Sequence, residues 1–272
     1  MSASDSRNLG FTLIELLGVL AIVGVLAGLS LAAISQASSK ARAIRCSANL
    51  RQLSLGLSQV TAEVGHFPLF QNTQQGPVLG AEHGSLWKDA VGKGLSQPPR
   101  SRNEAPKSDG VWNCPSFRMR DEEGRLHDSY GFNTGFEKSY SNRSYPEDLK
   151  RFGLGGHWEA GGDWFEPVRE SEVVAPSATY SIGDGFRGWS DFISVGGSQF
   201  ARIAGTNTLG AWPEGRARDR SARARHRGFA NVAFVDGHLE SIALKTLFSD
   251  TSENALRRWS RDHDPHLERI SP

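Results

Sequence analysis

The apolar run from Phe11 to Ile34 constrains this chain more than any other feature of its sequence. A helix rises about 1.5 Å per residue, so about 20 apolar residues cross the roughly 30 Å hydrocarbon core of a membrane. The run therefore predicts a membrane-spanning helix. Its only ionisable side chain is Glu15. Because an ionised carboxylate within the core costs about 2.5 to 3.5 kcal/mol on insertion scales, we expect Glu15 to have a partner.

Two common kinds of N-terminal segment explain this run poorly. A cleaved secretory signal has a basic start and an uncharged apolar stretch of about 7 to 15 residues. In this chain Arg7 is balanced by Asp5, and the apolar run is longer. A plain membrane anchor fits the length and remains the alternative, but such an anchor has no reason to include Glu15.

The stretch GFTLIE at residues 10–15 offers the carboxylate a partner. If the chain is cut after Gly10, the new amino group of Phe11 lies one helical turn from Glu15, or beside the Glu15 of a neighbouring subunit. The stretch and its apolar tail closely resemble the class III signal of type IV pilins and type II secretion pseudopilins. The resemblance implies that prepilin peptidase cleaves after Gly10 and that Phe11 is then methylated. It also implies that Glu15 sets the register of subunits during filament assembly.

The charges around the run oppose the orientation that this resemblance implies. The basic residues after the run are Lys40, Arg42, Arg45 and Arg51, whereas only Arg7 precedes it. The positive-inside rule would therefore place the rest of the chain in the cytoplasm. We follow the resemblance, because long domains translocate regardless of flanking charge. We expect a single-pass protein of the bacterial inner membrane, with its head in the periplasm or in an extracytoplasmic filament.

A stripe of apolar residues continues beyond the membrane segment at alternating spacings of four and three, which is typical of one face of a helix. The stripe consists of Cys46, Leu50, Leu53, Leu57, Val60 and Val64. Gly65 and Pro68 follow it, so we expect one helix from about Phe11 to Val64. A coiled-coil partner is the alternative, but fewer than three heptads favour packing within the chain.

The rest of the chain has little helical periodicity and is rich in glycine, proline and aromatic residues. Short apolar pieces predict strands at residues 111–112, 129–132, 179–182 and 192–195. Together with the resemblance, this predicts an α+β, pilin-like fold, with a long N-terminal helix packed on an antiparallel β-sheet. The expected parts are a leader (1–10), the transmembrane half of the helix (11–34), its amphipathic half (35–65) and a loop-rich globular head (66–272).

The chain has two cysteines, Cys46 on the apolar stripe and Cys114. If the head is exported to an oxidising compartment, a disulfide between them would tie the helix to the head and stabilise it by roughly 4 kcal/mol. Two buried free thiols are the alternative, because thiols pack as small apolar groups. We favour the disulfide, and two thiolates alone do not predict a metal site.

Near the C-terminus, residues 230–242 form two alternating runs joined at Asp236-Gly237, a strong hairpin signal. His226 precedes Asp236 by ten positions. This resembles the processing-associated motif of a large family of pseudopilin-like proteins, in which a histidine, nine residues and Asp-Gly occur in this order. Three further segments resemble the same family, namely Trp112 to Ser116, Tyr130 to Asn133 and Pro176 to Asp184.

The polar residues of this region allow a metal site as an alternative to a structural role. Pseudopilin heads include calcium sites, and the carboxylates of Asp184 and Asp236 with turn carbonyls would suit that ion. In the structural explanation, Asp236 is a turn residue that tolerates a positive φ, and His226 packs beside the hairpin. We expect no cofactor. The cluster from Asp262 to His266 is expected to be a solvated tail or a docked loop, with zinc binding as the speculative alternative.

Arginines crowd residues 214–228, where they could contact a phosphate backbone or an anionic polysaccharide. A solvated loop is the favoured explanation, because no aromatic residues are interleaved and the whole chain carries a formal charge of only +1. We therefore do not expect nucleic-acid binding.

The expected function is structural. The chain lacks the nucleophile elbow, P-loop, HExxH and dinucleotide patterns, so we do not expect an enzyme. The resemblance implies a pseudopilin or pilin-like subunit of a type II secretion or type IV pilus-like filament. The implied partners are prepilin peptidase, other pilin-like subunits that contact the N-terminal helix, and an inner-membrane assembly platform. The alternative is a minor pilin whose surface-exposed head binds DNA or polysaccharide.

Overall fold

The computed structural model describes most of the N-terminal helix and the core of the head. The described residues are 12–69, 87–96, 110–116, 129–138, 152–158, 165–184, 199–204, 225–250 and 252–267 of the 272. The chain divides into two compact units, Met1–Arg42 and Ala43–Pro272.

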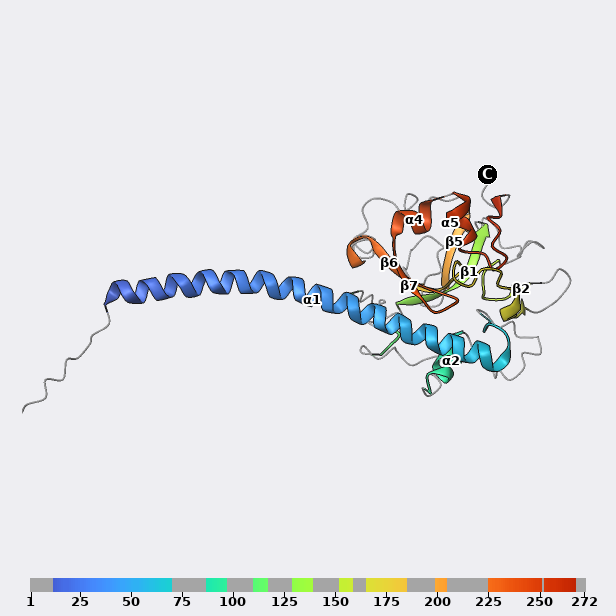
Figure 1. The fold of residues 1–272 in the computed structure, drawn as a ribbon, viewed down its shortest axis with the longest axis horizontal. Coiled ribbons are helices and arrows are strands. Elements are labelled where there is room, and N and C mark those ends of the chain that lie inside the picture. The colour runs from blue at the N-terminus through green and yellow to red at the C-terminus, as the bar shows by residue number, and fades with distance from the viewer. Residues whose placement is uncertain are drawn as a thin grey trace, which may run out of the picture. The chain divides into compact units, whose positions relative to one another are not determined.

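Helix α1 (Leu13–Val64) is continuous over 52 residues, as the sequence predicts (Figure 1). It is long and apolar enough to cross a membrane. The large apolar side chains of its first half, from Leu13 to Ile34, are exposed. At the other end, Gly65 has φ +78° and its N–H donates to the Thr61 carbonyl at 2.7 Å. A glycine with positive φ just past the last turn is a common way to end a helix.

The second half of α1 packs into the core of the head. Cys46, Leu50, Leu53 and Leu57 are buried, which confirms the apolar stripe and its packing within the chain. Val64 is 48 % exposed, so the buried stripe ends one turn earlier than the sequence predicts.

A short helix, α2 (Trp87–Gly94), lies against this part of α1 and was not expected from the sequence. The α-carbon of Gly94 approaches the Gly56 carbonyl so closely that a side chain at either glycine would collide with the other helix. Trp87 of α2 stacks on Phe132 with ring centroids 5.5 Å apart. The helix is therefore held by tertiary contacts.

The main sheet has five strands in the order β5-β1-β4-β6-β7. Its strands are β1 (Tyr130–Lys138), β4 (Tyr180–Asp184), β5 (Gln199–Ala204), β6 (Phe229–Phe234) and β7 (Leu239–Ala243). Four of these strands pair antiparallel, as expected, and β5 adds to β1 in parallel at one edge. A separate two-stranded sheet pairs β2 (His157–Trp158) with β3 (Phe165–Glu166). The fold is α+β with a long N-terminal helix.

The remaining described helices are short. They are η1 (Glu170–Glu172), η2 (Arg225–Arg227), α4 (Leu244–Ser249) and α5 (Glu253–Arg257). After α5, the ring of His266 stacks on Phe152 with a centroid distance of 3.4 Å, and His266 Nε2 lies 3.0 Å from the Asp262 carboxylate. The segment from Asp262 to His266 is thus a docked loop, one of the two structures expected for it.

The strand predictions are confirmed at residues 129–132 and 179–182, which fall on β1 and β4, and the hairpin at residues 230–242 is formed by β6 and β7. The prediction at residues 111–112 is wrong, because Val111 and Trp112 lie in a turn. Both side chains are buried, so their apolarity reflects core packing without strand pairing. The strand expected at residues 192–195 lies outside the described residues.

Candidate functional site

The start of α1 provides a local partner for Glu15. The Glu15 carboxylate accepts hydrogen bonds from the backbone N–H of Thr12 at 2.9 Å and from its hydroxyl at 2.8 Å. In return, the Glu15 backbone N–H donates to Thr12 Oγ1 at 3.3 Å. This reciprocal arrangement is a capping box, which satisfies two N–H groups that the first turn of a helix leaves without partners.

The capping box was not predicted from the sequence, although the sequence contains its pattern. Threonine followed three residues later by glutamate, just before an apolar run, is its pattern. Gly10 and Phe11 lie outside the described residues, so cleavage after Gly10, methylation of Phe11 and the pairing of its amine with Glu15 stay predictions.

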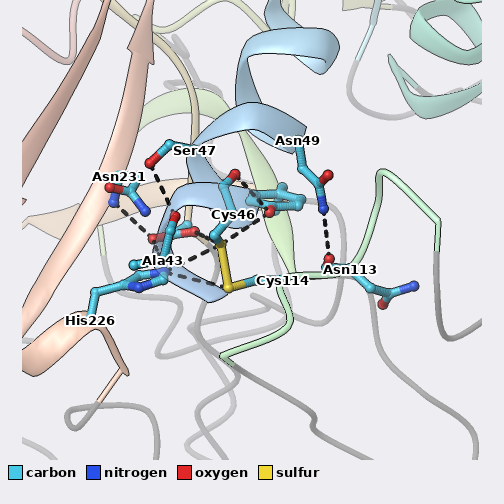
Figure 2. The surroundings of a disulfide bond; sticks show 10 residues. Ala43, Cys46, Ser47, Asn49, Asn113, Cys114, His226 and Asn231 are labelled. Atoms are coloured by element: carbon cyan, nitrogen blue, oxygen red, sulfur yellow. Dashed lines mark hydrogen bonds and ion pairs between the residues drawn. A yellow bond between two sulfur atoms is a disulfide. The ribbon is translucent and has the colours of Figure 1, made fainter. Parts of the chain in front are cut away.

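In the head, a disulfide joins Cys46 of α1 to Cys114 of the loop at residues 110–116 (Figure 2). The two α-carbons are 4.9 Å apart, and both side chains are fully buried. One turn further along α1, the Asn49 side chain donates to the Asn113 carbonyl at 2.9 Å. The loop is therefore fixed against α1 by one covalent and one hydrogen bond.

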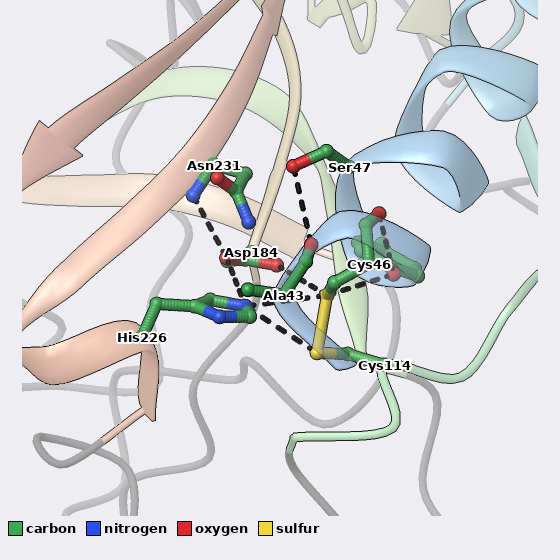
Figure 3. A network of polar contacts seen from close by, with 8 residues as sticks. Ala43, Cys46, Ser47, Cys114, Asp184, His226 and Asn231 are labelled. Atoms are coloured by element: carbon green, nitrogen blue, oxygen red, sulfur yellow. Dashed lines mark hydrogen bonds and ion pairs between the residues drawn. A yellow bond between two sulfur atoms is a disulfide. The ribbon is translucent and has the colours of Figure 1, made fainter. Parts of the chain in front are cut away.

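The His226 side chain points at this disulfide from the side opposite to Asn49 and Asn113 (Figure 2 and Figure 3). Its Nε2 atom lies 3.2 Å from Cys46 Sγ and 3.4 Å from Cys114 Sγ. The backbone of His226 has φ +47°, a conformation that few residues other than glycine adopt, so the surrounding contacts hold it there. The histidine of the C-terminal motif is thus a core residue that contacts the cysteine pair.

Asp184, the last residue of β4, completes the cluster. It is fully buried, and its Oδ2 atom lies 3.4 Å from His226 Nε2 while Oδ1 lies 3.8 Å from Cys46 Sγ. The Asn231 backbone N–H donates to Oδ2 at 2.8 Å, since β4 and β6 are neighbouring strands. On the other side, the hydroxyl of Tyr130 donates to the Cys46 carbonyl at 3.2 Å. The ends of three strands therefore meet α1 at this point.

The histidine and the Asp-Gly pair of the C-terminal motif lie at opposite ends of β6. His226 precedes β6 and Asp236 follows it, so the nine intervening residues include the whole strand. Asp236 lies in the turn between β6 and β7. The prediction that Asp236 adopts a positive φ is wrong, because the residue with positive φ in this turn is Gly237, at +90°. The motif therefore marks the two ends of β6.

The Asp236 carboxylate pairs locally with His238. Oδ1 accepts the His238 backbone N–H at 3.1 Å and lies 2.6 Å from the ring Nδ1. Partial desolvation opposes the shift, but the hydrogen bonds from the ring and backbone of His238 hold the pKa of Asp236 below its ordinary value.

Asp184 and Asp236 lie at opposite ends of β4. Asp184 ends that strand, whereas the Asp236 N–H donates to the carbonyl of Pro176, which precedes it. The two carboxylates are therefore not placed to share one calcium ion, and calcium binding by the head stays a prediction.

The arginine-rich stretch lies outside the described residues except for Arg225 and Arg227. A role for it in binding DNA or polysaccharide stays a prediction.

The cluster around the disulfide offers four donor atoms of metal-ligating type. One atom each from Cys46, Cys114, Asp184 and His226 lies within 4.8 Å of the others. The sequence predicted the pairing of Cys46 with Cys114, which the disulfide confirms. It did not predict that Asp184 and His226 join them, because separations such as the 180 positions from Cys46 to His226 follow no local pattern.

Comparisons with known proteins identify the N-terminus. The family model for the prokaryotic N-terminal methylation motif matches residues 5–31. No curated protein and no solved structure matches the chain. The matched segment contains the capping box and the first part of α1.

Proposed function

We propose that this type IV pilin-like protein is a structural subunit that prepilin peptidase processes and that then assembles through α1 into an envelope filament. The observation that carries the proposal is the methylation motif at residues 5–31, which extends into the apolar first half of the 52-residue helix α1. The filament belongs to a type II secretion or type IV pilus-like system.

The exposed apolar residues of α1 support assembly through this helix. From Leu13 to Ile34 its large side chains contact nothing else in the described structure that would bury them. In the membrane they face lipid, and in a filament they would face the same helix of other copies. When α1 moves from lipid into a filament, its apolar side chains exchange one apolar environment for another. The side chain of this segment that still needs a partner of opposite charge is Glu15.

The capping box provides hydrogen bonds to Glu15 but no positive charge. Its carboxylate already accepts two hydrogen bonds from Thr12. These bonds lower the cost of burial but leave the negative charge in place. The amine that cleavage creates at Phe11 would neutralise this charge, within one chain or between neighbouring copies.

The buried disulfide supports a head that lies in the periplasm. Disulfides persist in oxidising compartments and are rare in the cytosol. The proposal assigns the head no catalytic step.

The mature N-terminus tests the proposal. Mass spectrometry of the protein from cell envelopes should find a chain that begins with N-methylated Phe11. The variant Gly10→Leu should keep residues 1–10 and should not enter filaments. The matched control is Gly18→Leu, which places the same side chain on the open surface of α1 and should be cleaved normally. Retention of residues 1–10 in the wild-type protein contradicts the proposal.

A further inference from the structure

The buried cluster in the head combines the ligand types that zinc prefers. Two cysteine sulfurs, an imidazole nitrogen and a carboxylate converge from four separate segments, which are α1, the loop at residues 110–116, β4 and η2. Cys46, Cys114 and Asp184 are fully buried, and the His226 side chain is 6 % exposed. Each of these side chains is a common zinc ligand.

The distances from His226 Nε2 to the other donor atoms are close to those around one tetrahedral ion. With bonds of about 2.3 Å to sulfur and about 2.0 to 2.2 Å to nitrogen and oxygen, tetrahedral ligands are separated from one another by about 3.3 to 3.8 Å. His226 Nε2 lies 3.2 and 3.4 Å from the two sulfurs and 3.4 Å from Asp184 Oδ2. Cys46 Sγ lies 3.8 Å from Asp184 Oδ1. The carboxylate contacts His226 through Oδ2 and Cys46 through Oδ1, and the two sulfurs are bonded to each other. To bind one ion, the sulfurs must separate and one carboxylate oxygen must serve as the ligand.

We propose that, when the disulfide is reduced, Cys46, Cys114, Asp184 and His226 bind one Zn²⁺ ion. A dithiol reductant supplies two electrons and two protons and becomes a disulfide; a phosphine reductant supplies two electrons and becomes a phosphine oxide, with the oxygen and the two protons coming from one water molecule. In either case the sulfur–sulfur bond breaks and two thiols form. The two resulting thiols each lose a proton as they bind the ion. The site then holds Zn²⁺ with two thiolates, one neutral imidazole and one carboxylate, so its net charge is −1.

Neighbouring groups are placed to orient two of the ligands. The Asn231 N–H holds Asp184 Oδ2, and the Tyr130 hydroxyl lies 3.1 Å from Cys46 Sγ. Contacts of this kind to the ligands of a metal fix their orientation and raise its affinity. Because four protein ligands saturate a tetrahedral ion and the cluster is buried, the site is structural and has no open position for a substrate.

Zinc fits this donor set better than the other common ions. Calcium takes six to eight oxygen ligands, and magnesium requires octahedral oxygen coordination, whereas this cluster offers one carboxylate. Thiolate with imidazole is typical of zinc.

The zinc-bound and disulfide-bonded states would connect the same parts of the head. Both tie α1 to the loop at residues 110–116 across 68 positions of sequence. A reduced chain would therefore keep this connection until an oxidant forms the disulfide and releases the ion. Zinc uptake is independent of leader cleavage and filament assembly, so the two proposals fail separately.

The test measures zinc in the full-length protein in detergent. The reduced protein, freed of reductant without oxygen, is equilibrated with Zn²⁺ and desalted, and its zinc is counted by mass spectrometry. We expect about one tightly held ion per chain in the reduced protein and none in the oxidised protein. Co²⁺ in place of Zn²⁺ should show the absorption of a tetrahedral, thiolate-bound ion. Absence of zinc uptake by the reduced wild type, or equal uptake by the oxidised form, overturns the proposal.

Variants of two histidines locate the site. His226→Ala should weaken zinc binding at least about 10-fold, whereas the control His238→Ala, at an exposed histidine of the β6–β7 turn, should bind zinc as the wild type does. Circular dichroism of the oxidised variants checks their folding. If His226→Ala does not fold, Cys114→Ser in the reduced protein replaces it, with the same expected loss. Equal affinity of the wild type and these cluster variants rejects the assignment.

Discussion

His226 Nε2 lies 3.4 Å from Asp184 Oδ2, and both side chains are buried against the Cys46–Cys114 disulfide. A buried carboxylate is costly unless it is hydrogen-bonded, and here the Asn231 N–H provides one such bond at 2.8 Å. The pair connects the end of β4 to the residue that opens the C-terminal motif. The motif histidine therefore belongs to the point at which α1 is attached to the sheet.

Removal of the disulfide should destabilise the head. The double variant Cys46→Ala, Cys114→Ala opens a loop of 68 positions, and we expect a loss of roughly 4 kcal/mol in the free energy of unfolding. Urea denaturation of the full-length protein, with a chelator present to exclude metal binding, measures the difference. An unchanged denaturation midpoint would show that the bond contributes nothing.

The contact between α1 and α2 should be sensitive to one methyl group. A β-carbon on Gly94 would lie 2.5 Å from the Gly56 carbonyl oxygen and 2.9 Å from Val60 Cγ2. Gly94→Ala should therefore lower the free energy of unfolding by about 1 to 3 kcal/mol, because the helices must separate.

The matched control for this contact is Gly92→Ala on the same helix, where a β-carbon meets nothing within 4 Å. It should be neutral, or stabilising by up to about 1 kcal/mol, since alanine favours helix over glycine. Thermal or urea denaturation of both variants measures the contrast, and equal effects would mean that the close approach has no energetic consequence.

Two substitutions of Glu15 distinguish its role in helix capping from the role of its negative charge. Glu15→Gln keeps a side-chain oxygen that can accept from the Thr12 N–H but removes the charge, whereas Glu15→Ala removes both. If the charge pairs with the Phe11 amine, both variants should be cleaved by prepilin peptidase and neither should enter filaments. Immunoblots of sheared filaments and of the membrane fraction measure this.

The control for Glu15 is Glu63→Gln, an exposed position in the last turn of α1, which should assemble normally. Normal assembly of Glu15→Gln together with failure of Glu15→Ala would reduce the role of Glu15 to helix capping.

The Asp236 and His238 pair should make a small contribution to stability that depends on pH. Because the pKa of Asp236 is lower in the folded chain than its ordinary value, its contribution is present above about pH 4 and is lost as the pH falls through the folded value. Asp236→Asn keeps a residue suited to the turn and removes the charge. The pair is partly exposed, so we expect a loss of about 0.5 kcal/mol near neutral pH.

Urea denaturation of the wild type and of Asp236→Asn from neutral pH to below about pH 4 checks this. The difference between the two proteins should shrink as the solution becomes more acidic. A difference that grows on acidification would contradict the direction of the pKa shift.

The features that were predicted correctly from the sequence have local causes. The apolar run, the stripe from Cys46 to Val60 and the Asp236-Gly237 hairpin depend on spacings of a few residues, which fix a helix face or a turn before any tertiary contact forms. The capping box of Thr12 and Glu15 is equally local and could have been recognised by its pattern. The sequence by itself therefore determined the N-terminal helix, its buried face and the methylation motif at its start.

Tertiary structure alone decided the rest. The burial of Val111 and Trp112 in a turn and the existence of α2 depend on packing against the core, which overrides weak local preference. The cluster around His226 joins residues up to 180 positions apart, and no periodicity relates positions on different strands and helices. Only the pairing of β4 with β6 and the packing of α1 on the sheet bring a histidine, a carboxylate and two sulfurs to one buried point.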